Sequence, residues 1–428
     1  MSGRILITIA TIALAVGVSA CGGEDTSTSG PVTLNWFIFN EPSGGPQKIA
    51  DRCSKQSGGK YEINFEFLPA QADQQREQLV RRLGAKDASL DLLGLDVVWT
   101  GEFANAGWLA PVPASTERAV TANVFDSVLQ TARFEDRLYT IPIWSNTQLL
   151  WYRKDRVRTP PKTWDEMIDI GEKLGPTRGR IQVQANRYEG VVVLVNQLIE
   201  SAGTSILAGP KTVKLDKAPT EKALAIIGRL SNSTAAASNI TTSTEDTARL
   251  GFEGPANGPS DSSFMINYPF VYPSAKTNRP KTVFPNMGAA QFPAVEAGKP
   301  SKPPIGGINI GVSSYSKHKA EAFAATECLV KPDNQLEIAT AGGLPPVRED
   351  LYDQPEIDKV YPGFADEIRR AIKNAAPRPS ESPAYQDLSL AIQRAVHPTT
   401  KIDPKNPEPT YDTLRDNVEK AVKREGLL

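Results

Sequence analysis

The chain has 428 residues, with 48 lysines and arginines against 49 aspartates and glutamates, and its pI is near 6.3. This balance, without a basic stripe, argues against nucleic acid as a partner. The length exceeds what one ordinary hydrophobic core accommodates, so we expect two lobes.

The N-terminus predicts a lipoprotein. Arg4 is followed by an uncharged apolar run over residues 5–18, and Ser19 and Ala20 then precede Cys21. A short membrane helix is the alternative, but a run of about 14 residues falls short of the ~20 needed to span a bilayer. We therefore expect a signal peptide over residues 1–20, lipidation of Cys21, and a polar tether over residues 21–31. This would place the protein outside the cytoplasm, anchored to the cell membrane.

Two further cysteines, Cys53 and Cys328, remain after lipidation. An even pair in an oxidising compartment favours one long-range disulfide, and two buried free thiols are the alternative. The chain has only two histidines, His318 and His397, and no recognisable zinc-ligand spacing. We expect no metal centre and no cofactor.

The first elements alternate between strand and helix. Residues 32–39, 61–67 and 90–98 have the pattern of strands, and residues 47–57 and 72–83 that of helices. This order predicts an α/β fold with a parallel sheet.

The rest of the chain is less regular. Residues 138–142 and 148–152 predict strands that flank a crossover between lobes at 143–147, and residues 273–304 predict a surface loop. Further strands are expected at 262–268 and 306–312, and helices at 102–108, 163–174, 191–202, 221–231, 241–252, 318–329 and through most of the chain after residue 356.

Polar side chains recur where predicted strands end, at Asn40, Glu41, Asp96 and Asn146. Ligands of open α/β sheets bind beyond the carboxyl ends of the strands, so these residues should share a cleft. Carboxylates and carboxamides suit the hydroxyl groups of a sugar, because hydroxyls both donate and accept. The aromatic residues available to cover a sugar ring are Trp99, Trp144, Tyr268 and Phe270, although an aromatic residue in a strand is more often part of the core.

The same carboxylates would also suit a glycosidase, which places two carboxyl groups across the scissile bond. However, a hydrolase does not need a lipid tether and two clamping lobes. Motifs of other chemistries, such as Gly-x-Ser-x-Gly, a phosphate-binding loop or His-Glu-x-x-His, do not occur. We therefore expect a binding protein and no enzyme.

Two segments, residues 90–108 and 146–153, resemble the diagnostic stretch and the crossover strand of family-1 extracellular solute-binding proteins of sugar ABC importers. Residues 305–309, 342–348, 376–379 and 385–386 extend the resemblance to the actinobacterial trehalose-binding lipoproteins of that family. The resemblance implies a two-lobe periplasmic-binding-protein fold of the maltose-binding type (type II), with a hinge and an interlobe cleft. It divides the chain into an N-terminal lobe (32–143 and 307–352) and a C-terminal lobe (144–306 and 353–428).

The resemblance also implies a substrate-binding set and a ligand. The set comprises Asn40, Glu41, Asp96, Asn146, Glu245, Tyr268, Phe270, Gly343, Leu344 and Arg378. Its ligand would be trehalose or a related α-glucosyl disaccharide, with a maltose-type oligosaccharide or a glycerophosphodiester as alternatives. The implied partners are the permease subunits of an ABC importer and, indirectly, its ATPase, and we expect a monomer.

Two features depart from the trehalose-binding pattern. Tyr268 stands where such proteins usually carry Trp, and residues 254–263 form a longer turn rich in Pro and Gly. Structural roles also compete with the implied ones: Asp96 as a helix N-cap, Asn146 as a turn residue, Glu245 as a cap or solvated helix residue, and Arg378 as a surface charge.

Overall fold

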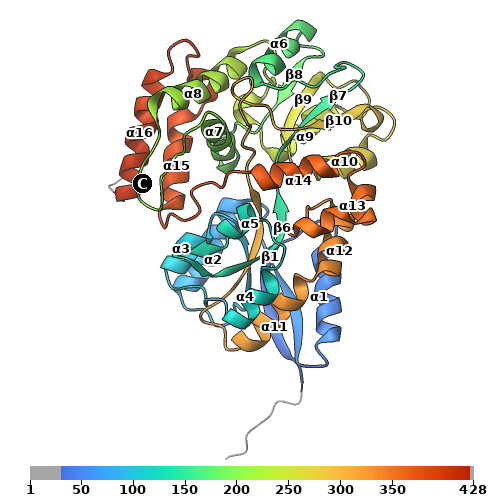
Figure 1. Ribbon diagram of the computed structural model, residues 1–428, viewed down its shortest axis with the longest axis vertical. Helices are drawn as coiled ribbons and strands as arrows, with labels where there is room; N and C mark the ends of the chain where they lie inside the picture. Colours follow the sequence, from blue (N-terminus) through green and yellow to red (C-terminus); the bar gives the residue numbers. More distant parts are fainter. Residues whose placement is uncertain (1–29, 425–428) are drawn as a thin grey trace, which may run out of the picture.

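Two β-sheets organise the computed structural model, which describes residues 30–424. They occupy the lower and upper halves of the molecule in Figure 1. The lower sheet has the strand order β2-β1-β3-β11-β6 and the upper sheet the order β10-β7-β9-β8. The lower strands are β1 (Val32–Phe39), β2 (Tyr61–Leu68), β3 (Leu92–Asp96), β6 (Thr140–Asn146) and β11 (Gly306–Val312), and the upper strands are β7 (Leu149–Arg153), β8 (Arg180–Gln182), β9 (Ser262–Asn267) and β10 (Met287–Ala290).

The lower sheet is mixed, whereas the sequence predicted a parallel one. β1 pairs in parallel with β2 and β3, as expected, but β11 is antiparallel to both β3 and β6. The reason lies in how β11 enters: the chain arrives from the upper half, so Gly306 starts β11 beside Asn146, where β6 ends. A strand that starts where its neighbours finish must run against them.

The passage between the sheets is shorter than predicted. Residues 143–146 belong to β6, because Trp144 pairs with Ile308 and Asn146 with Gly306 of β11. Only Thr147 and Gln148 separate β6 from β7, and both are buried. The predicted crossover at 143–147 therefore shrinks to two residues.

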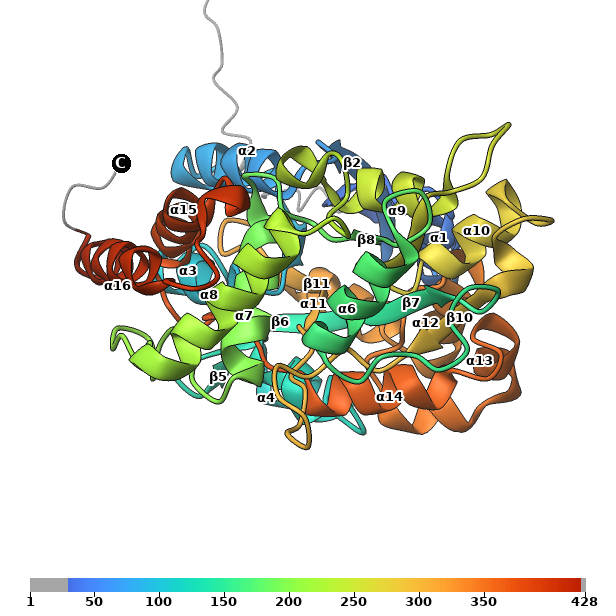
Figure 2. The same ribbon diagram turned by 90° about the horizontal axis from the view of Figure 1, so that it is seen from above.

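Helices surround each sheet (Figures 1 and 2). We call the lower sheet with its helices the first lobe and the upper sheet with its helices the second lobe. The first lobe has α1 (Gly45–Gln56), α2 (Ala72–Gly84), α3 (Thr100–Asn105), α4 (Ala114–Val120), α5 (Asp126–Gln130), α11 (Lys319–Leu329) and α12 (Pro332–Gly342), and a small ribbon of β4 (Arg133–Phe134) and β5 (Arg137–Leu138). The second has α6 (Trp164–Leu174), α7 (Glu189–Ser201), α8 (Lys217–Asn232), α9 (Glu245–Glu253), α10 (Val271–Asn278), α13 (Pro355–Val360), α14 (Ala365–Asn374), α15 (Tyr385–Val396) and α16 (Glu408–Lys423). Short 3₁₀ turns occur at Ile240–Thr242, Phe284–Asn286, Glu349–Asp353 and Thr399–Lys401.

The predicted loop over residues 273–304 is wrong for its first half. That stretch holds most of α10, a 3₁₀ turn and strand β10. β10 pairs with β7 and completes the upper sheet, and Val283, Met287 and Phe292 are buried beside it. Tertiary packing thus overrides a local composition rich in Pro and Gly. Helices α4, α5 and α12 were not predicted.

Each sheet has its own hydrophobic core. Trp36, Ile38 and Ile310 belong to a buried cluster of the first lobe, and Trp164 and Phe264 belong to one of the second. These clusters favour the two-lobe organisation that the length predicted, and a further buried cluster contains residues of both lobes and joins them. The exact lobe boundaries stay a prediction.

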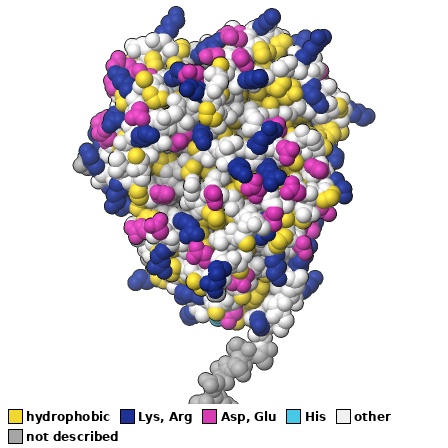
Figure 3. Space-filling view, viewed as in Figure 1, with side chains coloured by type: hydrophobic (Ala, Val, Ile, Leu, Met, Phe, Trp, Pro, Cys, Tyr) yellow, Lys and Arg dark blue, Asp and Glu magenta, His cyan; other side chains and the backbone are white. Residues whose placement is uncertain are grey.

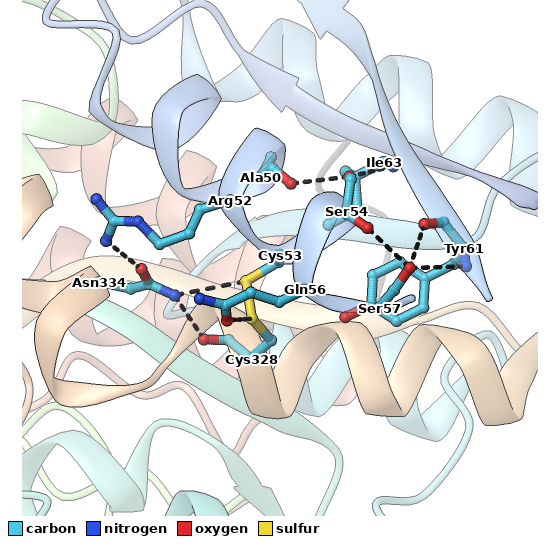
Figure 4. The surroundings of a disulfide bond; sticks show 10 residues. All are labelled: Ala50, Arg52, Cys53, Ser54, Gln56, Ser57, Tyr61, Ile63, Cys328 and Asn334. Carbon is cyan, nitrogen blue, oxygen red and sulfur yellow. Dashed lines mark hydrogen bonds between the residues drawn. A yellow bond between two sulfur atoms is a disulfide. The ribbon is translucent and has the colours of Figure 1, made fainter. Parts of the chain in front are cut away.

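A disulfide joins Cys53 of α1 to Cys328 of α11, with their Cα atoms 5.8 Å apart (Figure 4). Asn334, next to the bridge, donates from Nδ2 to the carbonyl oxygen of Cys328 at 2.7 Å. The structure thus has the predicted pair, and the alternative of two free thiols is wrong. The bridge ties together two helices of the first lobe that are 275 positions apart in the chain.

The predicted signal peptide and the lipidation site Cys21 lie outside the described residues. Within residues 30–424, no helix is both long and apolar enough to cross a membrane. On the face seen in Figure 3, acidic and basic side chains are interspersed, in line with the balanced charge of the sequence.

Candidate functional site

A cavity of about 910 Å³ lies between the two lobes, and both supply its walls. From the first lobe come the carboxyl ends of β1, β3 and β6, the start of β11 and the end of α12. From the second lobe come the first turns of α7 and α9 and the segment from Tyr268 through α10. The size lies within the range of about 300–1,000 Å³ that is typical of small-molecule sites.

Nine of the ten predicted substrate-binding residues line this cavity: Asn40, Glu41, Asp96, Asn146, Glu245, Tyr268, Phe270, Leu344 and Arg378. Gly343 is not among the described lining residues, although its neighbours Gly342 and Leu344 are. Gly343 ends α12 in the left-handed region, with φ of 65°, where glycine is favoured. Its conformation serves the helix end.

The aromatic candidates divide between core and cavity. Trp99 is 3% exposed and stacks on Phe103 within the first lobe, so the core interpretation is correct for it. Trp144 lines the cavity together with Phe39, and their rings meet edge to face with centroids 6.3 Å apart. Tyr268 also lines it, beside Gly306.

Arg378 connects the two sides of the cavity. It lies between α14 and α15, in a segment without helix or strand, and its side chain is 4% exposed. Its Nη2 donates to Asp96 Oδ1 at 3.0 Å, and its Nη1 donates to Glu189 Oε1 at the start of α7. Arg378 is therefore no surface charge. Asp96 also accepts the backbone N–H of Val98 at 3.2 Å, so it combines a local turn with this ion pair.

Glu41, which lines the cavity from the first lobe, is fixed by Ser43. Both the backbone N–H (3.1 Å) and the hydroxyl of Ser43 donate to Glu41 Oε2. Gly342 leaves room for this turn, since a Cβ there would lie 2.9 Å from Ser43 Oγ and 3.3 Å from Glu41 Oε1. A side chain at 342 would therefore push against Ser43, the residue that fixes this cavity-lining carboxylate.

Glu245 begins α9, but it is not the helix cap, which is Thr244 with a reciprocal capping box to Thr247. The Glu245 backbone N–H donates to the Tyr188 hydroxyl at 2.8 Å. Its half-buried carboxyl group lines the cavity without an ion pair to any described residue. Burial, and then the nearby carboxylates of Asp246 and Asp96, raises the pKa of Glu245 to about 7.

The cavity is acidic. Its lining includes six carboxyl groups (Glu41, Asp73, Asp96, Glu189, Glu245 and Asp246) but two guanidinium groups, those of Arg249 and Arg378. Arg249 is already paired with Asp246 and Glu253, and Arg378 with Asp96 and Glu189. No unpaired cation therefore remains among the described lining residues to bind an anion.

Three buried polar atoms of lining residues lack a hydrogen-bond partner: Asn146 Oδ1, Gln184 Nε2 and Arg378 Nε. Buried polar atoms of native proteins are rarely left unsatisfied. One acceptor and two donors together match hydroxyl groups, which serve in both roles. Asn146 is the last residue of β6 and no turn residue.

Sequence reasoning missed several lining residues, among them Phe39, Gln184, Tyr188, Glu189 and Arg249. A signal existed for Glu189, which lies two positions before the predicted start of an apolar helix at residue 191. The helix dipole favours a carboxylate in the first turn of a helix. The helix α7 accordingly begins at Glu189, two residues before the predicted start.

Known proteins share this architecture. The maltose-bound T. maritima MalE3 structure has a TM-score of 0.78 at 24% identity, covering 92% of this chain and 99% of that one. A Thermus thermophilus maltotriose binding protein bound with maltotriose has a TM-score of 0.71 at 21% identity, covering 92% of this chain and 100% of that one. These matches show the two-lobe fold of maltose-binding proteins.

Sequence relatives point the same way. A probable ABC transporter-binding protein of Deinococcus radiodurans is 26% identical over 366 residues, which cover 82% of this chain and 84% of that protein. The maltotriose-binding protein of Pyrococcus abyssi is 25% identical over 325 residues, covering 72% of this chain and 65% of that protein. The family model described as bacterial extracellular solute-binding protein matches residues 48–364, more than half of the chain. The chain therefore belongs to the bacterial extracellular solute-binding proteins, a family of non-enzymatic receptors.

Proposed function

We propose that this protein captures a small neutral saccharide outside the cytoplasm and delivers it to an ABC importer. The observation that carries this proposal is the polarity of the cavity: six carboxyl groups face two guanidinium groups, and both guanidinium groups are already paired. Such a lining repels an anion. Its carboxyl groups can accept hydrogen bonds from hydroxyl groups, while Gln184 Nε2 and Arg378 Nε are donors that have no partner within the protein.

Aromatic residues complete the match to a sugar. Trp144, Tyr268 and Phe270 line the same cavity and can cover the apolar C–H face of a pyranose ring. The names of several relatives agree with this class, since they are maltose- and maltotriose-binding proteins and an ABC transporter-binding protein.

Within this class, the ligand we propose is trehalose or a related α-linked glucose disaccharide. The support is the resemblance of the sequence to trehalose-binding lipoproteins. Tyr268 keeps a ring for stacking but is smaller than the Trp usual there, which favours tolerance of maltose-type or longer sugars. A glycerophosphodiester is the alternative ligand, but its phosphate would meet the carboxyl groups of Glu41 and Glu245, which have no ion-pair partner among the described residues.

Calorimetric titration with trehalose, maltose and glycerophosphocholine tests the ligand class. We expect heat of binding from trehalose, a weaker response from maltose and none from glycerophosphocholine. Binding of the phosphodiester with both sugars silent would overturn the proposal. Incubation with each disaccharide checks for hydrolysis, because glucose release would indicate a glycosidase.

The lipid anchor is part of the proposal and rests on the sequence before Cys21. A lipid-anchored receptor would stay beside the permease subunits that it supplies, and the importer's ATPase would act through them. Metabolic labelling with a fatty acid should mark the wild type and leave Cys21→Ser unlabelled. Equal labelling of both chains would place the lipid elsewhere.

A further inference from the structure

The carboxylate of Glu189 lines the sugar cavity, yet it is fully engaged by the protein itself. Oε1 accepts hydrogen bonds from Arg378 Nη1 and the Tyr385 hydroxyl, and Oε2 accepts one from Ser389 Oγ at 2.6 Å. All three donor residues are at most 4% exposed. Tyr385 and Ser389 both belong to α15, so Glu189 links α7 to α15 as well as to Arg378. A carboxylate with this many donors is better suited to holding other groups than to binding a ligand.

Arg378 depends on such support because its own backbone provides little. The residue lies between Pro377 and Pro379, outside any helix or strand. Its guanidinium is held from both sides, by Glu189 from the second lobe and by Asp96 at the end of β3 in the first lobe. The third nitrogen, Nε, is buried and has no hydrogen-bond partner, and the residue as a whole lines the cavity. Without Glu189, one of the two ion pairs that fix the guanidinium plane is lost, and the direction of Nε is no longer set.

We infer that Glu189 is a positioning residue for sugar binding: it holds Arg378 against Asp96 and so fixes the direction of Nε, whose missing partner would be a sugar oxygen. This inference rests on the proposed function, but it concerns a residue that acts through another and does not contact the ligand. It also means that Glu189 and Arg378 form one functional unit. Residues within one ion-pair network couple, so the effects of changing both should not add.

The ion-pair chain has a second consequence for the same unit. Asp96 and Glu189 come from different lobes and share one guanidinium. Moving the lobes apart must therefore break one of the two pairs, whichever lobe Arg378 follows. Glu189 thus also contributes to holding the cavity in the closed form that a sugar requires.

A double-mutant cycle tests this inference with trehalose as the probe. Glu189→Gln keeps the shape of the side chain and removes its charge, and we expect it to raise the Kd for trehalose about tenfold, which corresponds to about 1.4 kcal/mol. Arg378→Gln should weaken binding at least as much. In the double variant the Kd should equal that of Arg378→Gln alone. Multiplication of the two single effects would show that Glu189 acts independently of Arg378 and would overturn the inference.

Two controls separate positioning from folding and from the proposed function. Glu102→Gln removes a partly buried carboxylate that pairs with Arg76; neither residue lines the cavity, so this variant should leave the Kd unchanged. The Arg378 Nε–H resonance, assigned by its absence in Arg378→Gln, reports the side chain without any sugar. We expect its chemical shift and water exchange to change in Glu189→Gln. An unchanged resonance would refute the positioning role, even if the wild type bound no sugar at all.

Discussion

Arg378 donates to Asp96 across 3.0 Å, although 282 positions of sequence separate the two residues. The pair brings together the end of a first-lobe strand and a segment that precedes the last two helices. It lies at the wall of the cavity that we propose for the sugar, so it is the natural starting point for substitution.

Asp96→Ala should weaken trehalose binding tenfold or more. The carboxylate accepts charge-assisted hydrogen bonds, which are worth roughly 1.5–3 kcal/mol each, and its loss also leaves Arg378 with a single ion-pair partner. Calorimetric titration measures the Kd, with Glu102→Gln as the matched acidic control. An unchanged Kd in Asp96→Ala would place the sugar elsewhere.

Gly190→Ala should reduce sugar binding through crowding. A Cβ at residue 190 would lie 2.3 Å from Tyr188 Cζ and 2.6 Å from Gln184 Oε1, and both of these side chains line the cavity. Displacing Tyr188 would also disturb the hydrogen bond that its hydroxyl accepts from Glu245. We expect a Kd at least tenfold higher and a lower Tm.

The matched control for that substitution is Gly84→Ala at the end of α2, where a Cβ would meet nothing within 4 Å. We expect it to leave the Kd unchanged and to preserve or slightly raise the Tm, because alanine favours helix over glycine. If Gly190→Ala binds trehalose as tightly as this control, the first turn of α7 does not shape the site.

Glu245→Gln should change how stability depends on pH. The pKa of Glu245, about 7, is above its value in an unfolded chain. Between those two values the folded protein keeps a proton that the unfolded chain has released, so rising pH favours unfolding. The glutamine variant lacks this pH dependence, because its side chain does not ionise. In calorimetric scans of the unliganded protein, its Tm advantage over the wild type should therefore be larger at pH 8 than at pH 5, and an equal difference at both would contradict the raised pKa.

Removal of the disulfide should lower stability without changing affinity. The double variant Cys53→Ser/Cys328→Ser loses a cross-link over 275 positions, and removal of a native disulfide typically costs about 2–5 kcal/mol. Urea unfolding measures the loss. The Kd for trehalose should stay the same, because neither residue lines the cavity.

Thiol titration of the unfolded, unreduced wild type should detect no free Cys53 or Cys328, and two reactive thiols would disprove the bridge in solution.

The sequence predicted those parts of the molecule whose signals are local. Strands β1 and β2 follow from alternating or apolar runs, and the cavity positions Asn40, Asp96 and Asn146 follow from the rule that ligands bind at strand ends. Other cavity positions, such as Glu245 and Arg378, were predicted from the resemblance to a family.

What could not be predicted depends on pairing across long distances. Strand β10 exists because β7 is beside it, and β11 is antiparallel because the chain enters the lower sheet from the cavity side. The role of Glu189 likewise needs three partners that are 189 to 200 positions away in the chain. No local pattern contains that information.

Strand β1 runs from the end of the receptor that would carry the lipid tether to the end that lines the cavity. The first described strand residue, Val32, is at one end, and Phe39, which lines the cavity, is at the other. Eight residues of strand span about 26 Å. In the proposed lipoprotein, the pull of the membrane tether would thus reach the ligand only through a strand that is hydrogen-bonded on both sides, to β2 and β3. The lipid would then restrict the diffusion of the receptor without changing the shape of the cavity.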